Sequence, residues 1–240
     1  MEDLICTRSN KELLIRFLKE LKKSWKRNGP ILKQILYFPS FIKYNKDSKK
    51  TAVDWELPWI TIEGINFLEK EILNPYMNVF EYGSGGSTLF FSKKVKTVFS
   101  VEHNLEWFTI LRSKLESKSI GNVNLILYEP IPVMKDDYIV YKTRHEKRYF
   151  GYNFFDYVHS IDQFSDGFFD IIMIDGRSRI RCLNVVLNKL KIGGFLVFDN
   201  SDRSYYRESL KKFEHLLILK TFGPCISSLR FTSTNIYKKE

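Results

Sequence analysis

Residues 78–88 read Asn-Val-Phe-Glu-Tyr-Gly-Ser-Gly-Gly-Ser-Thr, an apolar strand that runs into an acid and a glycine-rich turn. The acid, Glu81, stands at the end of the strand, where it can accept hydrogen bonds from a cationic or amino-bearing ligand. Its negative charge would repel a phosphate group. Gly83 and Gly85 permit positive φ and let a ligand approach the main chain closely. The stretch therefore predicts a small-molecule pocket that is not a phosphate site.

Two familiar nucleotide-binding patterns fail at this turn. The Walker pattern needs Lys followed by Ser or Thr after its last glycine, and neither follows here. The dinucleotide fingerprint needs a glycine at its sixth position, which is Thr88 in this chain. Ser87 or Thr88 is expected to cap a helix that begins at Leu89. A tight turn without a ligand is the alternative, although a glycine cluster costs backbone entropy.

A second acid follows the next apolar run. Thr97 to Val101 is predicted as a strand, and Glu102 closes it 21 residues after Glu81. In a strand–helix–strand unit, that distance is typical of an acid that binds ribose hydroxyls. Glu102 is therefore the predicted ribose ligand, with a solvated acid at a strand end as the alternative.

The order of these motifs resembles that of the class I S-adenosylmethionine-dependent methyltransferases, over about residues 55–240. The glycine turn resembles the first motif of that family, residues 168–176 its fourth strand, and residues 193–200 its fifth strand. The resemblance implies a Rossmann-like α/β fold, with a mostly parallel seven-stranded sheet and a terminal antiparallel strand. It also implies S-adenosyl-L-methionine as the cofactor. The implied cofactor-binding residues are Glu81, Tyr82, Gly83, Ser84, Gly85, Ser87, Glu102, His103 and Asp175.

Oxygen-bearing side chains end the fourth and fifth strands. Asp175 follows the fourth, and Asp199 with Asn200 ends the fifth, so all three face the ligand crevice of an open parallel sheet. The two aspartates are the predicted catalytic residues. The trio resembles the Asp, Asp-Asn arrangement that holds the metal in catechol-type O-methyltransferases, which implies Mg²⁺ as an optional second cofactor. Pairing of the aspartates with nearby arginines is the alternative.

Those arginines suggest an acidic acceptor. Arg177 and Arg179 come directly after the fourth strand, and Arg203 follows the fifth, so they could hold a carboxylate or phosphate bidentately. Together with Asn200, they are the predicted substrate ligands. The predicted reaction is O-methylation of a small or saccharide hydroxyl. Helix capping and salt bridging are the alternative roles of these arginines.

The connection at residues 129–167 is too long for an ordinary link between strands and is rich in aromatic and basic residues. We expect a lid-like insertion that excludes water and shapes the acceptor pocket, with a plain surface excursion as the alternative. The resemblance implies that the adenine edge lies near residues 160–163. The proposed lid side chains are Tyr138, Tyr141, Arg144, His145, Lys147, Arg148, Tyr149, Tyr152, Phe154 and Phe155.

An alternation of strands and helices is predicted to position these residues. Nearly uninterrupted apolar runs indicate strands that are covered on both faces, and crossovers of helical length indicate parallel neighbours. The last two strands are close enough in sequence to pair antiparallel. The predicted helices span residues 61–73 and 105–117, and the further strands span residues 123–128, 171–174, 195–198, 216–221 and 232–237.

Residues 1–50 hold thirteen basic against five acidic side chains, which is +8 of the formal net charge of +10. Residues 11–27 place apolar side chains at helical spacing among lysines and arginines, so an amphipathic helix is predicted. Its apolar side is expected to pack on the catalytic domain or a second subunit; an anionic membrane surface and nucleic acid are the alternatives. The sequence thus predicts a basic helical extension over residues 1–50 and a methyltransferase domain over residues 51–240.

Several classes of protein are disfavoured by composition. No apolar run reaches the roughly 20 residues that span a bilayer, and the first residues lack the pattern of a secretory signal. A cytoplasmic location, peripheral at the inner membrane surface at most, is expected. Cys6, Cys182 and Cys225 have no paired spacing, so neither a disulfide framework nor a zinc site is indicated.

Two other functions stay open. An RNA methyltransferase would use the basic extension to attract phosphates, but no recognised RNA-binding motif is present and nucleic acid is not favoured as a partner. A non-catalytic module would bind the cofactor and dock on a membrane-associated assembly through the basic helix. The acids at three strand ends favour an enzyme.

Overall fold

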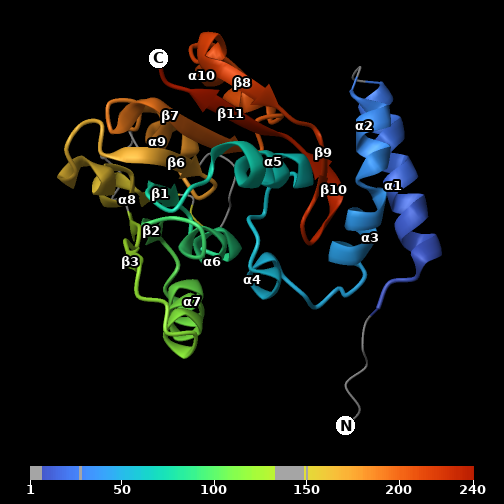
Figure 1. The fold of residues 1–240 in the computed structure, drawn as a ribbon, viewed down its shortest axis with the longest axis horizontal. Helices are drawn as coiled ribbons and strands as arrows, with labels where there is room; N and C mark the ends of the chain where they lie inside the picture. Colours follow the sequence, from blue (N-terminus) through green and yellow to red (C-terminus); the bar gives the residue numbers. More distant parts are fainter. Residues whose placement is uncertain (1–6, 27–28, 133–148, 150) are drawn as a thin grey trace.

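The computed structural model describes residues 7–26, 29–132, 149 and 151–240. A seven-stranded sheet in the order β3-β2-β1-β6-β7-β11-β8 lies at the centre (Figure 1). In this sheet β11 is antiparallel to both neighbours, and the other neighbouring strands run parallel. The Rossmann-like α/β fold with its one antiparallel strand is therefore confirmed. The strands are β1 Asn78–Tyr82, β2 Thr97–Glu102, β3 Val123–Leu127, β6 Phe169–Ile174, β7 Leu190–Asp199, β8 Leu217–Lys220 and β11 Thr234–Lys238.

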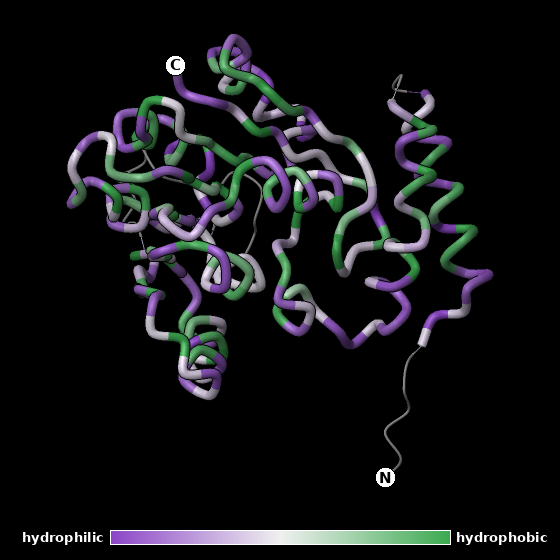
Figure 2. The backbone as a smooth tube through the Cα atoms, viewed as in Figure 1, coloured by the Kyte–Doolittle hydropathy of each residue, from purple (hydrophilic) through white to green (hydrophobic). Residues whose placement is uncertain are grey.

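Successive residues of the central strands enter opposite cores, because side chains alternate across a sheet. Val79 and Ile171 join one core, whereas Phe80 and Ile172 join the other. The hydrophobic colour of the central strands follows from burial on both faces (Figure 2). The helices that supply the covering layers are α4 Ala52–Trp55, α5 Ile62–Phe67, α6 Gly86–Ser92, α7 Leu105–Ser117, α8 Phe155–His159, α9 Arg179–Val185 and α10 Arg207–Lys211.

Most predicted elements are present, with local differences. The helix predicted over residues 61–73 is α5 followed by a π-helical turn, Leu68–Ile72. Short 3₁₀ turns occur at Ser160–Gln163, Ser204–Tyr206 and Glu214–Leu216. The predicted start of a helix at Leu89 is wrong, since α6 begins at Gly86 and Gly85 stands at its N-cap.

The amino-terminal extension is helical, as predicted, and packs on a hairpin of β9 Gly223–Cys225 and β10 Ser228–Thr232 (Figure 1). Leu13 and Phe17 meet Phe41 and Phe231 in a small core of their own. Glu20 Oε2 also accepts the main-chain N–H of Phe231 at 3.2 Å. One apolar side of the first helix therefore packs on the domain, which is one of the expected partners. The helices are α1 Asn10–Trp25, α2 Ile31–Leu36 and α3 Phe38–Asn45.

The predicted lid is described only in part. Its described portion begins with β4 Ile131–Pro132, which pairs with β5 Tyr152–Asn153, and continues into α8. Within the described ranges, no helix is both long and apolar enough to cross a membrane. The proposed lid residues that lie outside the described residues are Tyr138, Tyr141, Arg144, His145, Lys147 and Arg148.

Candidate functional site

Acidic residues from four neighbouring strands meet at one edge of the sheet. Glu81 lies in β1, Glu102 ends β2, Asp175 follows β6 and Asp199 ends β7. The strand order β2-β1-β6-β7 makes these four carboxyl-terminal ends adjacent. In open parallel sheets, ligands bind outside the carboxyl ends of the strands. The structure thus brings together the acids that the sequence predicted for one site.

The glycine turn after β1 is held against the loop after β6. Gly83 has φ +93°, and a Cβ there would lie 2.7 Å from the Cα of Gly176. Its main-chain N–H donates to the carbonyl of Val101 at 2.9 Å, and the Asp175 N–H donates to the Tyr82 carbonyl at 3.0 Å. Glycine is therefore required by packing between two loops, in addition to any ligand.

Glu102 joins the glycine turn to the start of α7. Its Oε1 accepts the main-chain N–H groups of His103 at 2.8 Å and Asn104 at 2.9 Å. Its Oε2 accepts the N–H of Ser84 at 3.1 Å and the Ser84 hydroxyl at 3.0 Å. Burial acts to raise the pKa of Glu102, but the hydrogen bonds from His103 and Asn104 outweigh it and lower the pKa below its usual value. Glu102 is therefore a fixed carboxylate at neutral pH.

Glu81 is fully buried beneath the turn. Its Oε1 accepts a hydrogen bond from Thr88 Oγ1, which also accepts the N–H of Gly85 at 2.9 Å. Its Oε2 accepts no hydrogen bond from a described residue. Burial raises the pKa of Glu81 to about 7; nearby hydroxyl groups oppose this shift and the charge of Asp175 reinforces it. A buried oxygen without a donor is suited to a ligand that brings one.

Trp107 covers the turn from α7, a contact that the sequence reasoning missed. Its indole Nε1 donates to the Ser84 carbonyl at 2.8 Å, and its ring faces Gly85, where an added Cβ would lie 3.7 Å from it. The side chain of Asn104 caps α7 by accepting the N–H of Trp107 at 2.8 Å. An Asn cap three residues before an aromatic residue, just after the predicted ribose acid, is the signal that could have found it.

Aromatic rings enclose the Glu102 side of the site. The His103 ring lies 5.1 Å from that of Tyr149 and 5.9 Å from that of Phe154. Tyr149 and Phe154 come from the described end of the predicted lid, and both are buried. His103 Nδ1 also lies 2.8 Å from Glu102 Oε1. This part of the long connection therefore packs next to the candidate cofactor residues.

Other predicted cofactor residues have different surroundings. The Tyr82 side chain points into the core, where its hydroxyl donates to the carbonyl of Val158 at 2.7 Å. Only the main chain of Tyr82 reaches the site edge. Ser87 lies buried in the first turn of α6. The predicted adenine edge at 160–163 is a 3₁₀ turn, in which Gln163 Nε2 donates to the Ser160 carbonyl at 2.7 Å.

Arg179 lies buried between the two aspartates. Its Nη2 donates to Asp175 Oδ1 at 2.8 Å, and its Nη1 donates to the carbonyl of Asp199 at 2.5 Å. Its Nε donates to the carbonyl of Gly176 at 3.0 Å. Nη1 also lies 3.6 Å from Asp199 Oδ2. Every nitrogen of the guanidinium thus contacts the end of β7 or the loop after β6. This is the salt-bridging role that the sequence left open as an alternative. A role of Arg179 in binding the acceptor stays a prediction.

The two aspartates are harder to ionise than usual. Burial raises the pKa of Asp199 to about 8; the charge of Asp175 reinforces this shift and Arg179 opposes it. Burial also raises the pKa of Asp175, against the charges of Arg179 and the half-buried Arg177. Thr234 Oγ1 donates to Asp199 Oδ1 at 3.0 Å. A carboxyl group with a pKa near neutrality can exchange protons at physiological pH.

Asn200 has φ +55°, and its side chain is bound within the protein. Its Nδ2 donates to Asp199 Oδ2 and, at 2.9 Å, to Thr232 Oγ1. Its Oδ1 accepts a hydrogen bond from Arg203 Nη2, whose Nη1 donates to Tyr205 Oη at 3.1 Å. Arg203 is exposed beside this group. The predicted substrate ligands Asn200 and Arg203 therefore contact each other.

The residues predicted to hold Mg²⁺ do not fit a cation. Asp175, Asp199 and Asn200 do come together, but the guanidinium of Arg179 contacts both aspartates. A cation there would meet a fixed positive charge. Among the described residues, no group of three or more His, Cys, Asp and Glu could hold a metal ion. The prediction of a metal at these three residues is not supported.

A cavity of about 610 Å³ lies elsewhere. Its lining includes Asp166, Lys189 and Leu216, which lead into the first residues of β6, β7 and β8. It therefore opens at the amino-terminal ends of the strands, opposite the four acids. The chemistry of the strand ends, rather than the size of a cavity, identifies the candidate site.

Among known proteins, the chain is similar to solved structures at low sequence identity. No protein-family model matches the chain, and no curated protein matches it. Among solved structures, an S-adenosylmethionine-dependent O-methyltransferase of Thermotoga maritima is 14% identical and has a TM-score of 0.49, covering 79% of this chain and 71% of its own. A tRNA methyltransferase of Aquifex aeolicus is 16% identical with a TM-score of 0.48, covering 80% and 76%. A candidate methyltransferase of Streptococcus mutans in complex with SAH is 15% identical with a TM-score of 0.48, covering 73% and 94%.

Proposed function

We infer that this chain, which has the class I methyltransferase fold, is a cytoplasmic S-adenosylmethionine-dependent methyltransferase that methylates an oxygen of a small or saccharide acceptor. The observation that carries this proposal is the pair of acids on either side of the glycine turn. Glu102 is a fixed carboxylate at the end of β2, and Glu81, near the end of β1, keeps one buried oxygen that accepts no hydrogen bond from the described part of the chain. A ligand with a ribose diol at one end and an amino group at the other would complement these two acceptors.

The cofactor would be held by Glu102, the main chain of residues 83–85 and Glu81. Glu102 is proposed to accept a ribose hydroxyl at Oε2 in place of the Ser84 hydroxyl that it accepts in the structure. Glu81 Oε2 is proposed to accept the amino group. When bound, the cofactor supplies an electrophilic methyl group on a sulfonium. Trp107 and the Tyr149–Phe154 aromatic pair exclude water from this side of the site.

On the acceptor side, Asp175 is the proposed proton acceptor. Its side chain is partly exposed, unlike that of Asp199, and its raised pKa makes it a stronger base than an ordinary carboxylate. Arg179 fixes its orientation through Nη2. Asp199 supports this arrangement by sharing the guanidinium. Most of the rate enhancement would come from alignment, which can contribute about 7–11 kcal/mol.

An acidic acceptor is favoured by the arginines that border this group. Arg203 is exposed next to Asn200, and Arg177 lies on the loop that carries Asp175. A carboxylate or phosphate on a saccharide would complement both charges. RNA would present phosphates to the same arginines, so an RNA substrate is an outcome that the assay must separate.

Calorimetry tests the cofactor assignment. Glu102→Gln keeps the size of the side chain but removes the charge that a ribose diol requires, so the affinity for S-adenosylmethionine should fall about tenfold or more. Glu106→Gln, an exposed position on α7, is the matched control and should bind normally. Equal affinity in both variants would remove the ribose assignment.

A transfer assay tests the reaction class. Purified protein and methyl-labelled cofactor are incubated with acidic saccharides, small phenols and RNA, and the labelled atom is identified in the product. Label on a saccharide or phenol oxygen is the expected result. Label confined to RNA would replace the proposed acceptor, and cofactor binding without label in any acceptor class would favour the non-catalytic module.

A further inference from the structure

The amino-terminal helices leave a hydrophobic surface uncovered. We call it the α1–α2 face, and it consists of Leu14, Leu18, Trp25, Leu32, Ile35 and Leu36. Leu32 is 84% exposed, Leu36 77% and Trp25 74%. Single exposed apolar residues are common in soluble proteins, but a cluster of six on two neighbouring helices indicates a binding surface.

Helical spacing makes this surface continuous along α1. Leu14, Leu18 and Trp25 are four and seven residues apart, so they share one side of the helix. Leu13 and Phe17, one position earlier, are buried on the β9–β10 hairpin. The helix therefore has one apolar stripe that packs inside the protein and a second, adjacent stripe that the described chain leaves uncovered.

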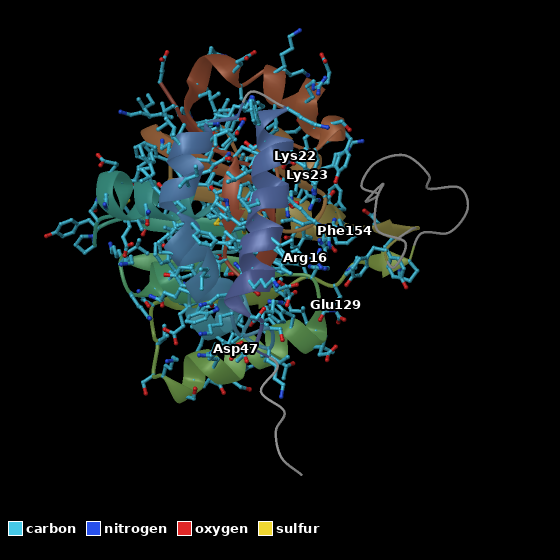
Figure 3. All side chains as sticks on the ribbon, turned by 90° about the vertical axis from the view of Figure 1, so that its right-hand side faces the viewer. Arg16, Lys22, Lys23, Asp47, Glu129 and Phe154 are labelled. Carbon is cyan, nitrogen blue, oxygen red and sulfur yellow. The ribbon has the colours of Figure 1, made fainter. Side chains whose placement is uncertain are left out.

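The second helix extends the same surface. Gln34 fixes the inward side of α2, because its Nε2 donates to Ser24 Oγ at 2.8 Å and to the carbonyl of Phe222 at 2.5 Å. Leu32, Ile35 and Leu36 must then project away from the hairpin. The two helices are in contact and lie side by side in the outer layer (Figure 3).

Positive charge borders the α1–α2 face. Lys11, Lys19, Lys22 and Lys26 are exposed and form no ion pair with a described residue. Lys22 lies on α1, on the side of the molecule that faces the viewer in Figure 3. The acid Glu20 is buried and already accepts the N–H of the hairpin. The surface therefore combines large apolar side chains with unneutralised lysines.

We propose that the α1–α2 face binds an anionic lipid membrane, on which the protein lies without crossing it. An amphipathic helix with Trp and Leu on one side and Lys beside them enters the headgroup region, where the apolar side chains leave water and the lysines meet lipid charges. A second copy of this chain would oppose lysines with lysines. Nucleic acid would satisfy the lysines but leave Leu32 and Leu36 without an apolar partner.

The α1–α2 face is linked to the candidate site through β10. Phe231 in β10 donates to Glu20 of α1, and the next residue, Thr232, accepts from Asn200 at the site. If the proposed function holds, the acceptor belongs to the surface layer of the membrane, for example a saccharide carried on a lipid.

Vesicle sedimentation of the full chain, without cofactor or acceptor, tests the membrane proposal separately from the proposed function. The probes are vesicles of phosphatidylcholine alone and of phosphatidylcholine with roughly a third phosphatidylglycerol. We expect binding to the anionic vesicles that weakens as salt is added. The double variants Leu32→Gln/Leu36→Gln and Lys22→Glu/Lys26→Glu should each lower the partition coefficient about tenfold or more.

Matched variants outside the α1–α2 face distinguish specific vesicle binding by this face from non-specific binding by exposed apolar or basic residues. Ile192→Gln replaces a residue that is 81% exposed on β7, and Lys96→Glu/Lys220→Glu makes the same charge change at exposed positions outside the extension. Both should bind vesicles as the unaltered chain does, with the same thermal midpoint. Absence of binding to anionic vesicles, an equal loss in the control variants, or a change from dimer to monomer in Leu32→Gln/Leu36→Gln would each overturn the proposal. Capture of RNA in place of vesicles would do the same.

Discussion

Gly83 and Gly176 face each other across the candidate site, and neither has room for a side chain. A Cβ on Gly83 would lie 2.7 Å from the Cα of Gly176, and a Cβ on Gly176 would lie 1.9 Å from Tyr157 Oη. Their contact sets the distance between the loops that follow β1 and β6. Because Glu81 and Asp175 adjoin these loops, the glycine pair also fixes the proposed cofactor side relative to the proposed acceptor side.

Gly176→Ala should destabilise the fold by about 1–3 kcal/mol, because an added methyl group is forced into the Tyr157 hydroxyl in a packed core. Chemical denaturation measures the change. Gly121→Ala is the control, since nothing lies within 4 Å of a Cβ there. Equal stability of the two variants would show that the loops can separate at no cost.

The stability of the protein should depend on pH through Glu81. The unfolded side chain loses its proton near pH 4.5, whereas burial keeps the folded one protonated to about pH 7. Between these values the native state binds more protons, so the free energy of unfolding falls as pH rises and levels off above the folded pKa.

Glu81→Gln removes this term. Relative to the unaltered protein, the variant should gain about 1–3 kcal/mol between pH 4.5 and pH 7, as measured by urea unfolding at several pH values. Glu106→Gln should show no such gain, because that side chain is exposed. Parallel pH curves for the Glu81 variant and the unaltered protein would contradict the burial argument.

Arg179→Met should cost about 3–5 kcal/mol, because it leaves the buried carboxyl group of Asp199 and the partly buried one of Asp175 without their shared partner. Arg207→Met, an exposed position, should change stability by less than about 0.5 kcal/mol. Arg203→Ala should also fold normally but raise the KM for an acidic acceptor. Thermal unfolding and steady-state kinetics together distinguish the structural arginine from the binding one.

Turnover should not respond to EDTA or to added Mg²⁺, because the Arg179 guanidinium already contacts both aspartates. The measurement is the transfer rate with and without chelator, after the acceptor class is known. A rate that falls in EDTA and recovers on adding Mg²⁺ would return the metal to the mechanism.

Trp107→Phe should weaken binding of S-adenosylmethionine several-fold while keeping the fold, because it removes one hydrogen bond to the Ser84 carbonyl and retains the ring. Trp59→Phe is the control, since that ring is 56% exposed. Calorimetry on both variants decides whether the indole N–H stiffens the loop over the cofactor.

Strand positions could be predicted from the sequence because the central strands are buried on both faces. The runs at 97–101 and 171–174 are apolar with few interruptions, and each lies within an observed strand. The acids at the strand ends follow from the same reasoning, since parallel strands end at one edge. Fold class, sheet direction and the gathering of Glu81, Glu102, Asp175 and Asp199 were therefore accessible without coordinates.

Contacts between distant segments were not accessible in this way. Gly83 packs against Gly176, and the Ser84 hydroxyl donates to Glu102 Oε2. Both contacts depend on the conformation of the loops after the strands. The β9–β10 hairpin lies in a stretch with no strong period, and its role as the seat of α1 rests on tertiary packing. The role of Arg179 could not be decided from the sequence either. Its position after the fourth strand suited a substrate ligand as well as the observed buried side chain that binds Asp175 and Asp199.

The β9–β10 hairpin ties the amino-terminal helices to the acceptor end through two consecutive residues, Phe231 and Thr232. A fragment that begins at residue 51 would lack Leu13, Phe17 and Phe41, which cover Phe231. The apolar side of the hairpin would then be exposed to solvent. Such a fragment should aggregate on expression. The loop at Asn200 would also lose support, because Asn200 is held by Thr232 of that hairpin. Samples for structure determination should therefore keep residues 1–50 together with the domain that they cover.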